Sequence, residues 1–310
     1  MTAVLDPFIL ERAPGPIVEV DPALLRARAA LNDLLAQLAR VDDTALTYVW
    51  TWDGKSVDVR YAFYRALETI ESATSHLARA MAGRDSSEAR DAVAATTAAR
   101  WEVQGILATL ADADLDADPG GGEWTVRQTL AHIIGGQRGY AWGNAYWIST
   151  RNEPKPDGPR RVPAGLFEAM PKEEDEAVGS VAQVRARLDD IVDATASRYA
   201  TLTPDEMDIT GGWSGFPVTI GFRMWRWPSH IEEHTVQVEK TLDLLDRRRT
   251  EVQYLIRLIT RAFGRLEAVE FGLPAQATAS GVLDDLAGAL RAVPAGLDEA
   301  IAAAVPAEEG

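Results

Sequence analysis

His230 and His234 stand four residues apart in the segment WPSHIEEH, residues 227–234. Positions i and i+4 of a helix lie on one face, with Cβ atoms roughly 5–6 Å apart. This spacing allows two imidazoles to bind one metal ion, as in other His-x-x-x-His sites on helices. His132 lies much earlier, in a second amphipathic segment. Three of the four histidines of this chain therefore predict an open site for a divalent metal ion.

Three neutral imidazoles leave a coordination position free for water or a thiolate. A metal ion in such a site lowers the pKa of a bound water or thiol and so produces a nucleophile near neutral pH. The chain contains no cysteine, which excludes disulfides, a cysteine nucleophile and iron–sulfur clusters. Any thiol chemistry would therefore use a thiol that the substrate brings.

Three charged residues near the histidine pair are further candidates. Glu233 adjoins His234 and has two interpretations, a partner or base at the metal site or an ordinary surface glutamate. Arg226 and Arg223 precede His230 by about one and two helical turns. They are predicted either to bind a carboxylate of a thiol cofactor or acidic substrate in bidentate fashion, or to form ordinary ion pairs.

Composition excludes several classes of partner. The 310 residues are 46% hydrophobic and 25% charged, as in ordinary globular proteins, and the net charge is -16. An acidic surface repels phosphate backbones and anionic lipid, so we expect a small-molecule substrate and neither nucleic acid nor membrane as partner. The first residues do not resemble a signal peptide, and no apolar run reaches about 18 residues. We therefore expect a cytoplasmic protein.

Hydrophobic periodicity predicts an all-α protein. Apolar residues recur at three- and four-residue steps in most of the chain, and strand signals are almost absent. Residues 47–61 are ambiguous, because alternating aromatic residues precede the turn pair Asp53-Gly54; we favour a helix from about Ser56. Residues 211–217 are predicted as a loop. The predicted helices cover residues 23–40, 56–82, 86–110, 125 to beyond 147, 180–199, 219 or 228 to 245, 251–271 and 280–291.

Two helix starts carry capping signals. Thr125 with Gln128 three residues later is a capping-box pattern, and Ser229 with Glu232 offers a second one. The remaining histidine, His76, has Ser72 and Ala80 one turn away, so we interpret it as a structural or surface residue.

Two of these motifs together resemble a known family. The segment WTVRQTLAHI, residues 124–133, resembles the second-helix signature of the DinB-like four-helix bundles, and HIEEH, residues 230–234, resembles their fourth-helix motif. The resemblance covers roughly residues 85–246. It implies a bundle that holds one divalent metal ion, commonly zinc or nickel, on His132, His230 and His234. Its better-understood members are transferases or isomerases that use mycothiol, bacillithiol or glutathione, including maleylpyruvate isomerase.

We therefore expect three parts of the chain. Residues 1–84 are predicted to be an arm and a helical extension packed on the bundle, residues 85–246 the DinB-like bundle, and residues 247–310 a C-terminal helical extension. The expected function is a metal-dependent transfer of a low-molecular-weight thiol. The alternatives are a metal-binding stress-response or ligand-binding module without turnover, and a hydrolase that uses the same site. Family habit also suggests a homodimer.

Overall fold

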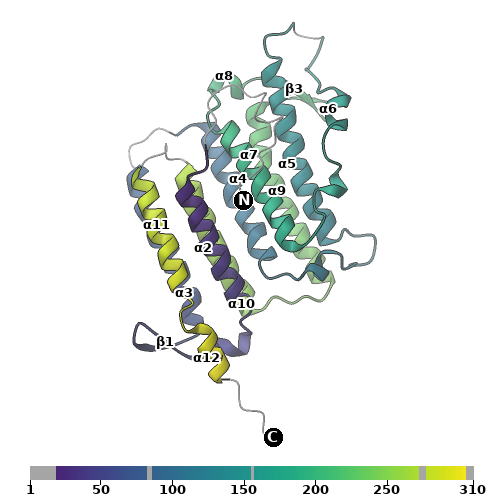
Figure 1. Cartoon of the computed structure of the whole chain (residues 1–310). Coiled ribbons are helices and arrows are strands. Elements are labelled where there is room, and N and C mark those ends of the chain that lie inside the picture. Colours follow the sequence, from purple (N-terminus) through teal and green to yellow (C-terminus); the bar gives the residue numbers. More distant parts are fainter. Residues whose placement is uncertain (1–18, 82–85, 155–156, 272–276, 305–310) are drawn as a thin grey trace. The chain divides into compact units, whose positions relative to one another are not determined.

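The computed structural model describes residues 19–81, 86–154, 157–271 and 277–304, and its regular structure is almost entirely helical (Figure 1). This confirms the all-α prediction. The chain divides into two compact units. The first is built mainly from residues 84–103 and 110–248, and the second from residues 21–83, 104–109 and 249–310.

Four long helices lie side by side in the first unit (Figure 1). They are α4 (Glu88–Leu107), α5 (Val126–Ser149), α7 (Val181–Tyr199) and α9 (Ile220–Leu244), and the last turn of α4 is counted with the second unit. Short elements occupy the connections: η2 (Asp112–Leu115), α6 (Ala164–Glu168), η3 (Glu173–Asp175) and α8 (Pro204–Met207).

Buried aromatic and polar side chains hold α5 and α7 together. Tyr199 is fully buried, and its hydroxyl donates to the carbonyl oxygen of Ala141 at 2.6 Å. Gln137 donates to Thr195 at 3.1 Å. Buried polar groups cost free energy unless they are paired, so these bonds select one alignment of the two helices. That alignment also fixes the face that α5 turns toward α9.

A hairpin leads into α9. Strands β3 (Thr210–Trp213) and β4 (Phe216–Thr219) pair antiparallel, where the sequence analysis expects a loop. That expectation was wrong because a two-residue turn inside this segment brings its two ends together as strands. Ser214 and Gly215 have φ angles of 49° and 87°, as such a hairpin turn requires. A Cβ on Gly211 would lie 1.8 Å from the Trp147 ring, so only glycine lets the hairpin pack there.

The second unit is also built on four long helices, drawn from both ends of the chain. They are α2 (Pro22–Leu38), α3 (Arg60–Met81), α10 (Glu251–Phe271) and α11 (Ala277–Ala292). Helix α2 packs along α11, and α3 packs along α10 and α11. A buried ion pair between Arg28 and Glu267 joins α2 to α10. Shorter elements are η1 (Asp43–Thr47), β1 (Val49–Trp52), β2 (Lys55–Asp58) and α12 (Leu297–Ala304).

The ambiguous segment of the sequence forms a hairpin. Residues 49–52 pair with residues 55–58, and α3 begins only at Arg60, so the predicted helix start near Ser56 was wrong. Asp53 and Gly54 have φ angles of 49° and 71°. The turn preference of this pair outweighs the helical periodicity of the residues that follow.

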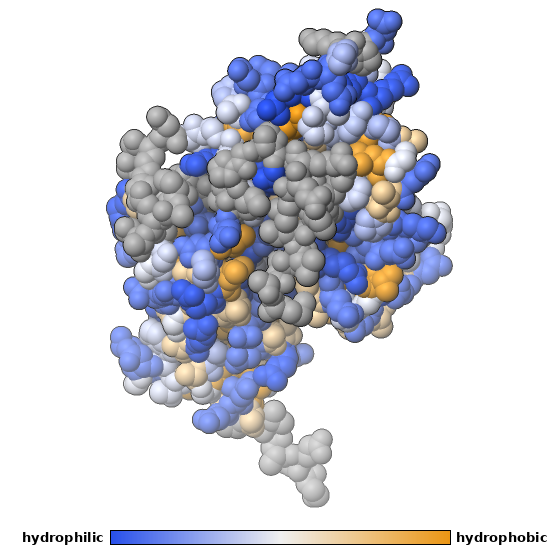
Figure 2. Space-filling model, turned by 45° about the horizontal axis from the view of Figure 1, so that its top comes forward, coloured by the Kyte–Doolittle hydropathy of each residue, from blue (hydrophilic) through white to orange (hydrophobic). Residues whose placement is uncertain are grey.

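The surface offers no extended apolar band in the view of Figure 2. The described residues there are mostly hydrophilic, with small separate hydrophobic areas. Two of the most exposed large apolar side chains, Val49 and Phe216, lie on the two hairpins. Among the described helices, none combines the length and the apolar character that crossing a bilayer requires.

Candidate metal centre

Helix α5 positions His132 through its first turn. The Thr125 side chain accepts from the backbone N–H of Gln128, and the Gln128 side chain accepts from the backbone N–H of Thr125. This confirms the capping box that the sequence predicts. Because the helix start is fixed, His132 lies two turns in, on the face of α5 that packs against α9.

Helix α9 positions the other two histidines. It begins after the N-cap Thr219, so Ser229 lies inside the helix and the second predicted capping box was wrong. The Ser229 hydroxyl instead donates to the carbonyl oxygen of Arg226 at 3.2 Å. Pro228 lies inside the helix and has no N–H to donate to the preceding turn. His230 and His234 follow it on one face.

The three imidazoles converge. Their ligand nitrogens all lie within 4.8 Å of one another, and His230 Nε2 is 3.3 Å from His132 Nε2. Two nitrogens that bind one tetrahedral zinc ion at about 2.0–2.1 Å lie about 3.3–3.4 Å apart. The ring centroids are separated by 4.5–5.0 Å. The donor set and its spacing fit a divalent metal ion, as the sequence predicts.

Two residues outside the predicted set orient the ligands. Glu173 in η3 lies 3.0 Å from His132 Nδ1, and Gln237 Oε1 lies 2.8 Å from His234 Nδ1. Since both partners offer an oxygen acceptor, each Nδ1 carries the proton and each Nε2 keeps its lone pair for a metal. Sequence reasoning missed both residues. Gln237 follows His234 by three positions and could have been found, whereas Glu173 comes from a separate connection.

Burial keeps His230 neutral. Its side chain is 5% exposed, and desolvation, together with neighbouring His234 and His132, lowers its pKa to about 3. Desolvation also lowers the pKa of His234. Metal binding needs the neutral imidazole. The fold therefore presents these two ligands in the required protonation state at neutral pH.

The stability of the metal-free protein should depend on pH through His230. The unfolded chain binds a proton at this residue below about pH 6.5 and the folded chain does not, so stability is present above that pH and is lost as the pH falls toward 3. The expected loss is about 1.4 kcal/mol per pH unit. Urea unfolding of metal-free wild type and His230→Gln between pH 7 and 4 measures it. Parallel pH profiles for the two proteins would contradict this assignment.

A glycine on α5 makes room for His230. A Cβ added to Gly136 would lie 2.5 Å from His230 Cε1, whereas a Cβ on Gly139 would meet only Met170 Cε at 3.7 Å. We expect Gly136→Ala to displace the imidazole and weaken zinc binding about tenfold or more. Gly139→Ala is the matched control, because it makes the same change in the same helix. Chelator competition measures both, and equal affinities would refute the steric argument.

Aromatic rings surround the histidines. Trp124 stacks on His234 with centroids 6.5 Å apart and meets His132 edge-on at 5.2 Å. Tyr140 meets His230 edge-on at 5.5 Å. Trp124 is 38% exposed, so one aromatic wall of the centre faces solvent.

The three predicted charged residues divide into two groups. Arg226 donates to the Glu233 carboxylate and also to the Ser229 hydroxyl at 3.0 Å. This pair lies beside the ligands on α9, with the Glu233 side chain more exposed than that of Arg226. Arg223, the third of these residues, is buried and has other contacts.

Arg223 is a buried cation without a carboxylate partner in the part of the chain that the structure describes. It is 3% exposed, and burial lowers its pKa to about 10. Its guanidinium lies over the rings of Tyr140 and Trp147 and donates to the carbonyl oxygen of Gly139 at 3.2 Å. Its Nε has no hydrogen-bond partner. A Cβ on Gly143 would lie 2.4 Å from the guanidinium, so this glycine makes the space for it.

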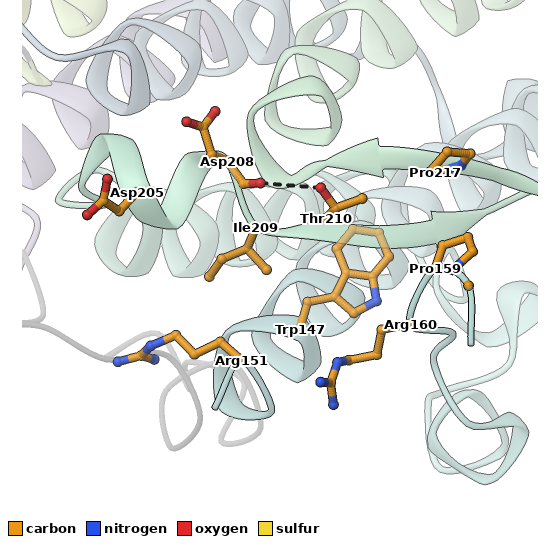
Figure 3. A pocket seen from close by; sticks show the side chains of 10 residues that line it. Trp147, Arg151, Pro159, Arg160, Asp205, Asp208, Ile209, Thr210 and Pro217 are labelled. Carbon is orange, nitrogen blue, oxygen red and sulfur yellow. Dashed lines mark hydrogen bonds between the residues drawn. The ribbon is translucent and has the colours of Figure 1, made fainter. Parts of the chain in front are cut away.

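Two cavities lie near this arginine. One of about 330 Å³ is lined by Arg223 together with Arg161 and Trp213. Another of about 470 Å³ borders Trp147, whose buried indole Nε1 has no hydrogen-bond partner among the described residues (Figure 3). In Figure 3, the arginine and aspartate side chains extend on different sides of Ile209. The charged residues lining this second cavity are Arg151, Arg160, Asp205 and Asp208.

Comparison with known proteins identifies one family. The model of the DinB superfamily matches residues 95–238, a segment that contains all three histidines. This confirms the resemblance to a DinB-like family that the sequence motifs indicate. No curated protein and no solved structure matches the chain.

Proposed function

Residues 95–238 belong to the DinB superfamily, and from this premise we propose that the protein is a metal-dependent enzyme that transfers a low-molecular-weight thiol to a small electrophile. The observation that carries the proposal is the convergence of His132, His230 and His234, with two of their Nδ1 atoms bound to oxygen acceptors. A zinc or nickel ion held there would lower the pKa of a coordinated thiol and make it nucleophilic near neutral pH.

The residues of the chain prepare and hold the reactants. Glu173 and Gln237 fix the rings of His132 and His234, and burial keeps His230 neutral. The thiol must lose its proton before transfer, and the Glu233 carboxylate is the candidate base. Arg226 now holds that carboxylate. A substrate carboxylate that pairs with Arg226 would free Glu233 to accept the proton.

Arg223 supports an acidic substrate or cosubstrate. A buried guanidinium without a carboxylate favours an anion that enters its cavity, by charge-assisted hydrogen bonds. Tyr140 lies between this arginine and the metal centre, in contact with both Arg223 and His230. A molecule with a carboxylate at Arg223 would have to extend past Tyr140 to bring its reactive end to the histidines.

Replacing Arg223 should weaken substrate binding and leave the metal in place. Arg223→Met is expected to raise KM for the acidic reactant about tenfold or more, because one charge-assisted hydrogen bond contributes about 1.5–3 kcal/mol. Arg223→Lys keeps the charge but loses the planar guanidinium and its paired N–H donors, so an intermediate KM is expected. Steady-state kinetics and metal content measure the two effects separately. Unchanged KM in both variants would remove Arg223 from the proposed site.

Metal content and thiol consumption test the function itself. Untagged protein is measured by elemental analysis beside His132→Ala and His234→Ala, and wild type is then assayed with glutathione, mycothiol and bacillithiol against electrophilic acceptors. About one zinc or nickel ion per chain, lost in both variants, together with metal-dependent thiol consumption, would support the proposal. Bound metal without consumption of any thiol would favour a binding module or a hydrolase. Wild type that cannot be loaded with metal would overturn the proposal.

A further inference from the structure

The two hairpins of the chain are built alike. In the second unit Val49 pairs with Asp58 and Trp52 with Lys55; in the first unit Thr210 pairs with Thr219 and Trp213 with Phe216. Each pair of equivalent positions differs by 161 residues (210 − 49 and 213 − 52). Both turns have two residues with positive φ, at 53–54 and 214–215. The hairpins therefore share length, register and turn conformation.

The likeness continues on both sides of the hairpins at the same offset of 161. Helix α2 ends at Leu38 and α7 at Tyr199, and each is followed by a single helical turn with a side-chain N-cap, at Asp42 and Thr203. A long helix follows each hairpin, α3 or α9. The succession of a helix, a single helical turn, a hairpin and a second helix thus occurs twice in the chain. No residue is inserted in one copy relative to the other.

Individual contacts repeat as well. Ile70 in α3 and Ile231 in α9 are equivalent, and both are fully buried. The next turn carries Thr74 and Thr235, whose hydroxyls donate to the carbonyl oxygens of those two isoleucines at 2.8 and 2.7 Å. Equivalent residues of the same type include Trp52 and Trp213, Gly54 and Gly215, Val57 and Val218, Arg65 and Arg226, Ile70 and Ile231, Glu71 and Glu232, and Thr74 and Thr235.

The equivalence places a cavity of the second unit where the first unit has its histidines. This cavity has a volume of about 540 Å³ and lies between α3 and α11. Thr69 and Ala73 line it at the positions of His230 and His234. The residues of α3 that line it are Arg65, Glu68, Thr69, Ser72, Ala73 and His76, and their equivalents are Arg226, Ser229, His230, Glu233, His234 and Gln237.

Helix α11 is the counterpart in the second unit of α5, the helix that carries the third ligand, His132. Helix α11 packs on α3 as α5 packs on α9. At an offset of 153, four buried positions of α11 fall on buried positions of α5; this offset places Asp285 at the position of His132, and Asp285 lines the cavity. The coinciding buried pairs are Leu283 and Leu130, Leu286 and Ile133, Ala287 and Ile134, and Leu290 and Gln137.

We propose that the second unit is a second copy of the metal-binding bundle, with its helices in a permuted order, and that its cavity is a latent metal site. Thr69, Ala73 and Asp285 occupy the three ligand positions. One carboxylate without imidazoles does not hold a zinc-like ion, so the wild-type chain binds one metal ion and not two. Restoring histidines at the three positions should therefore create a second tris-imidazole site.

The test installs these ligands and removes the original ones. Thr69→His, Ala73→His and Asp285→His are combined in a chain that also carries His132→Ala, His230→Ala and His234→Ala. About one cobalt or zinc ion per chain is expected, with the visible absorption of tetrahedral cobalt. Thr69→His with Asp285→His, which leaves buried Ala73 intact, should bind cobalt more weakly. This readout does not depend on catalysis, nor on whether the natural site binds metal.

Matched controls decide the result. The control combines Asp285→His with Glu68→His and Ser72→His, which place the two α3 histidines one position before the predicted ligand positions. This combination should bind cobalt at least tenfold more weakly. Equal binding by the control would overturn the proposal. So would two metal ions in wild type, or absence of cobalt binding in both installed variants when circular dichroism shows native helix content.

Discussion

Replacing His230 with alanine is expected to lower the affinity of the protein for zinc by about 100-fold or more. Loss of a residue that only orients a ligand typically costs 10–100-fold, and loss of a ligand should exceed that. His230 is also the ligand whose Nε2 lies 3.3 Å from that of His132, and its removal leaves only two imidazoles, which lie on different helices. Competition with a chromogenic chelator measures the change.

The fourth histidine provides the control for this result. His76 is exposed and lies in the other unit, so His76→Ala should leave zinc affinity unchanged. Circular dichroism of both variants checks that the helices are intact. A His230→Ala protein that is folded and binds zinc like wild type would show that the three histidines do not form the metal centre.

Replacing Asp193 with alanine is expected to destabilise the first unit by about 3–5 kcal/mol. Arg100 in α4 is fully buried, and it donates to the Asp193 carboxylate at 2.9 Å. Asp189 lies farther from the guanidinium, at 3.4 Å, and is partly exposed. Removing Asp193 therefore takes from a buried cation the carboxylate that accepts its 2.9 Å hydrogen bond. Urea unfolding followed by tryptophan fluorescence measures the loss.

A paired substitution separates charge from packing at this position. Replacing both partners with apolar residues, as in Arg100→Met with Asp193→Leu, removes the buried cation together with its carboxylate and should recover most of the lost stability. If the free energy of unfolding of Asp193→Ala lies within about 1 kcal/mol of that of wild type, the buried arginine is solvated or is compensated by other groups. A double variant that is less stable than Asp193→Ala would mean that packing, and not charge, dominates.

Local sequence signals determined most of the helices. Their apolar period of about 3.6 residues reflects burial of one face, and that signal lies within each segment. The capping box at Thr125 and Gln128 fixed the start of α5, because both partners are three residues apart. His230 and His234 belong to the same helix face for the same reason. The first hairpin was considered and rejected in favour of a helix, and the second was predicted as a loop, because the turn pairs Asp53-Gly54 and Ser214-Gly215 are short signals that compete with longer patterns.

The internal repeat could not be recognised from the sequence because few equivalent residues of the two units are identical. Two bundles with the same buried positions need only apolar residues there, so Leu130 and Leu283 match while the ligand positions have diverged to His132 and Asp285. The likeness becomes visible once strand register and turn conformation align the two halves. The second copy also takes its helices from both ends of the chain, which no single stretch of sequence reveals.

Sequence by itself determined the fold class, the helix faces and, through the family motifs, the three histidines. Tertiary structure decided which polar groups meet them. Glu173 reaches His132 from a connection 41 residues away, and the packing of α9 on α5 buries Arg223 where no carboxylate of the described residues pairs with it. Hydrogen bonds and charge pairs act over a few ångströms in space. Residues far apart in the chain acquire such neighbours only when helices pack, so only the folded structure could assign them.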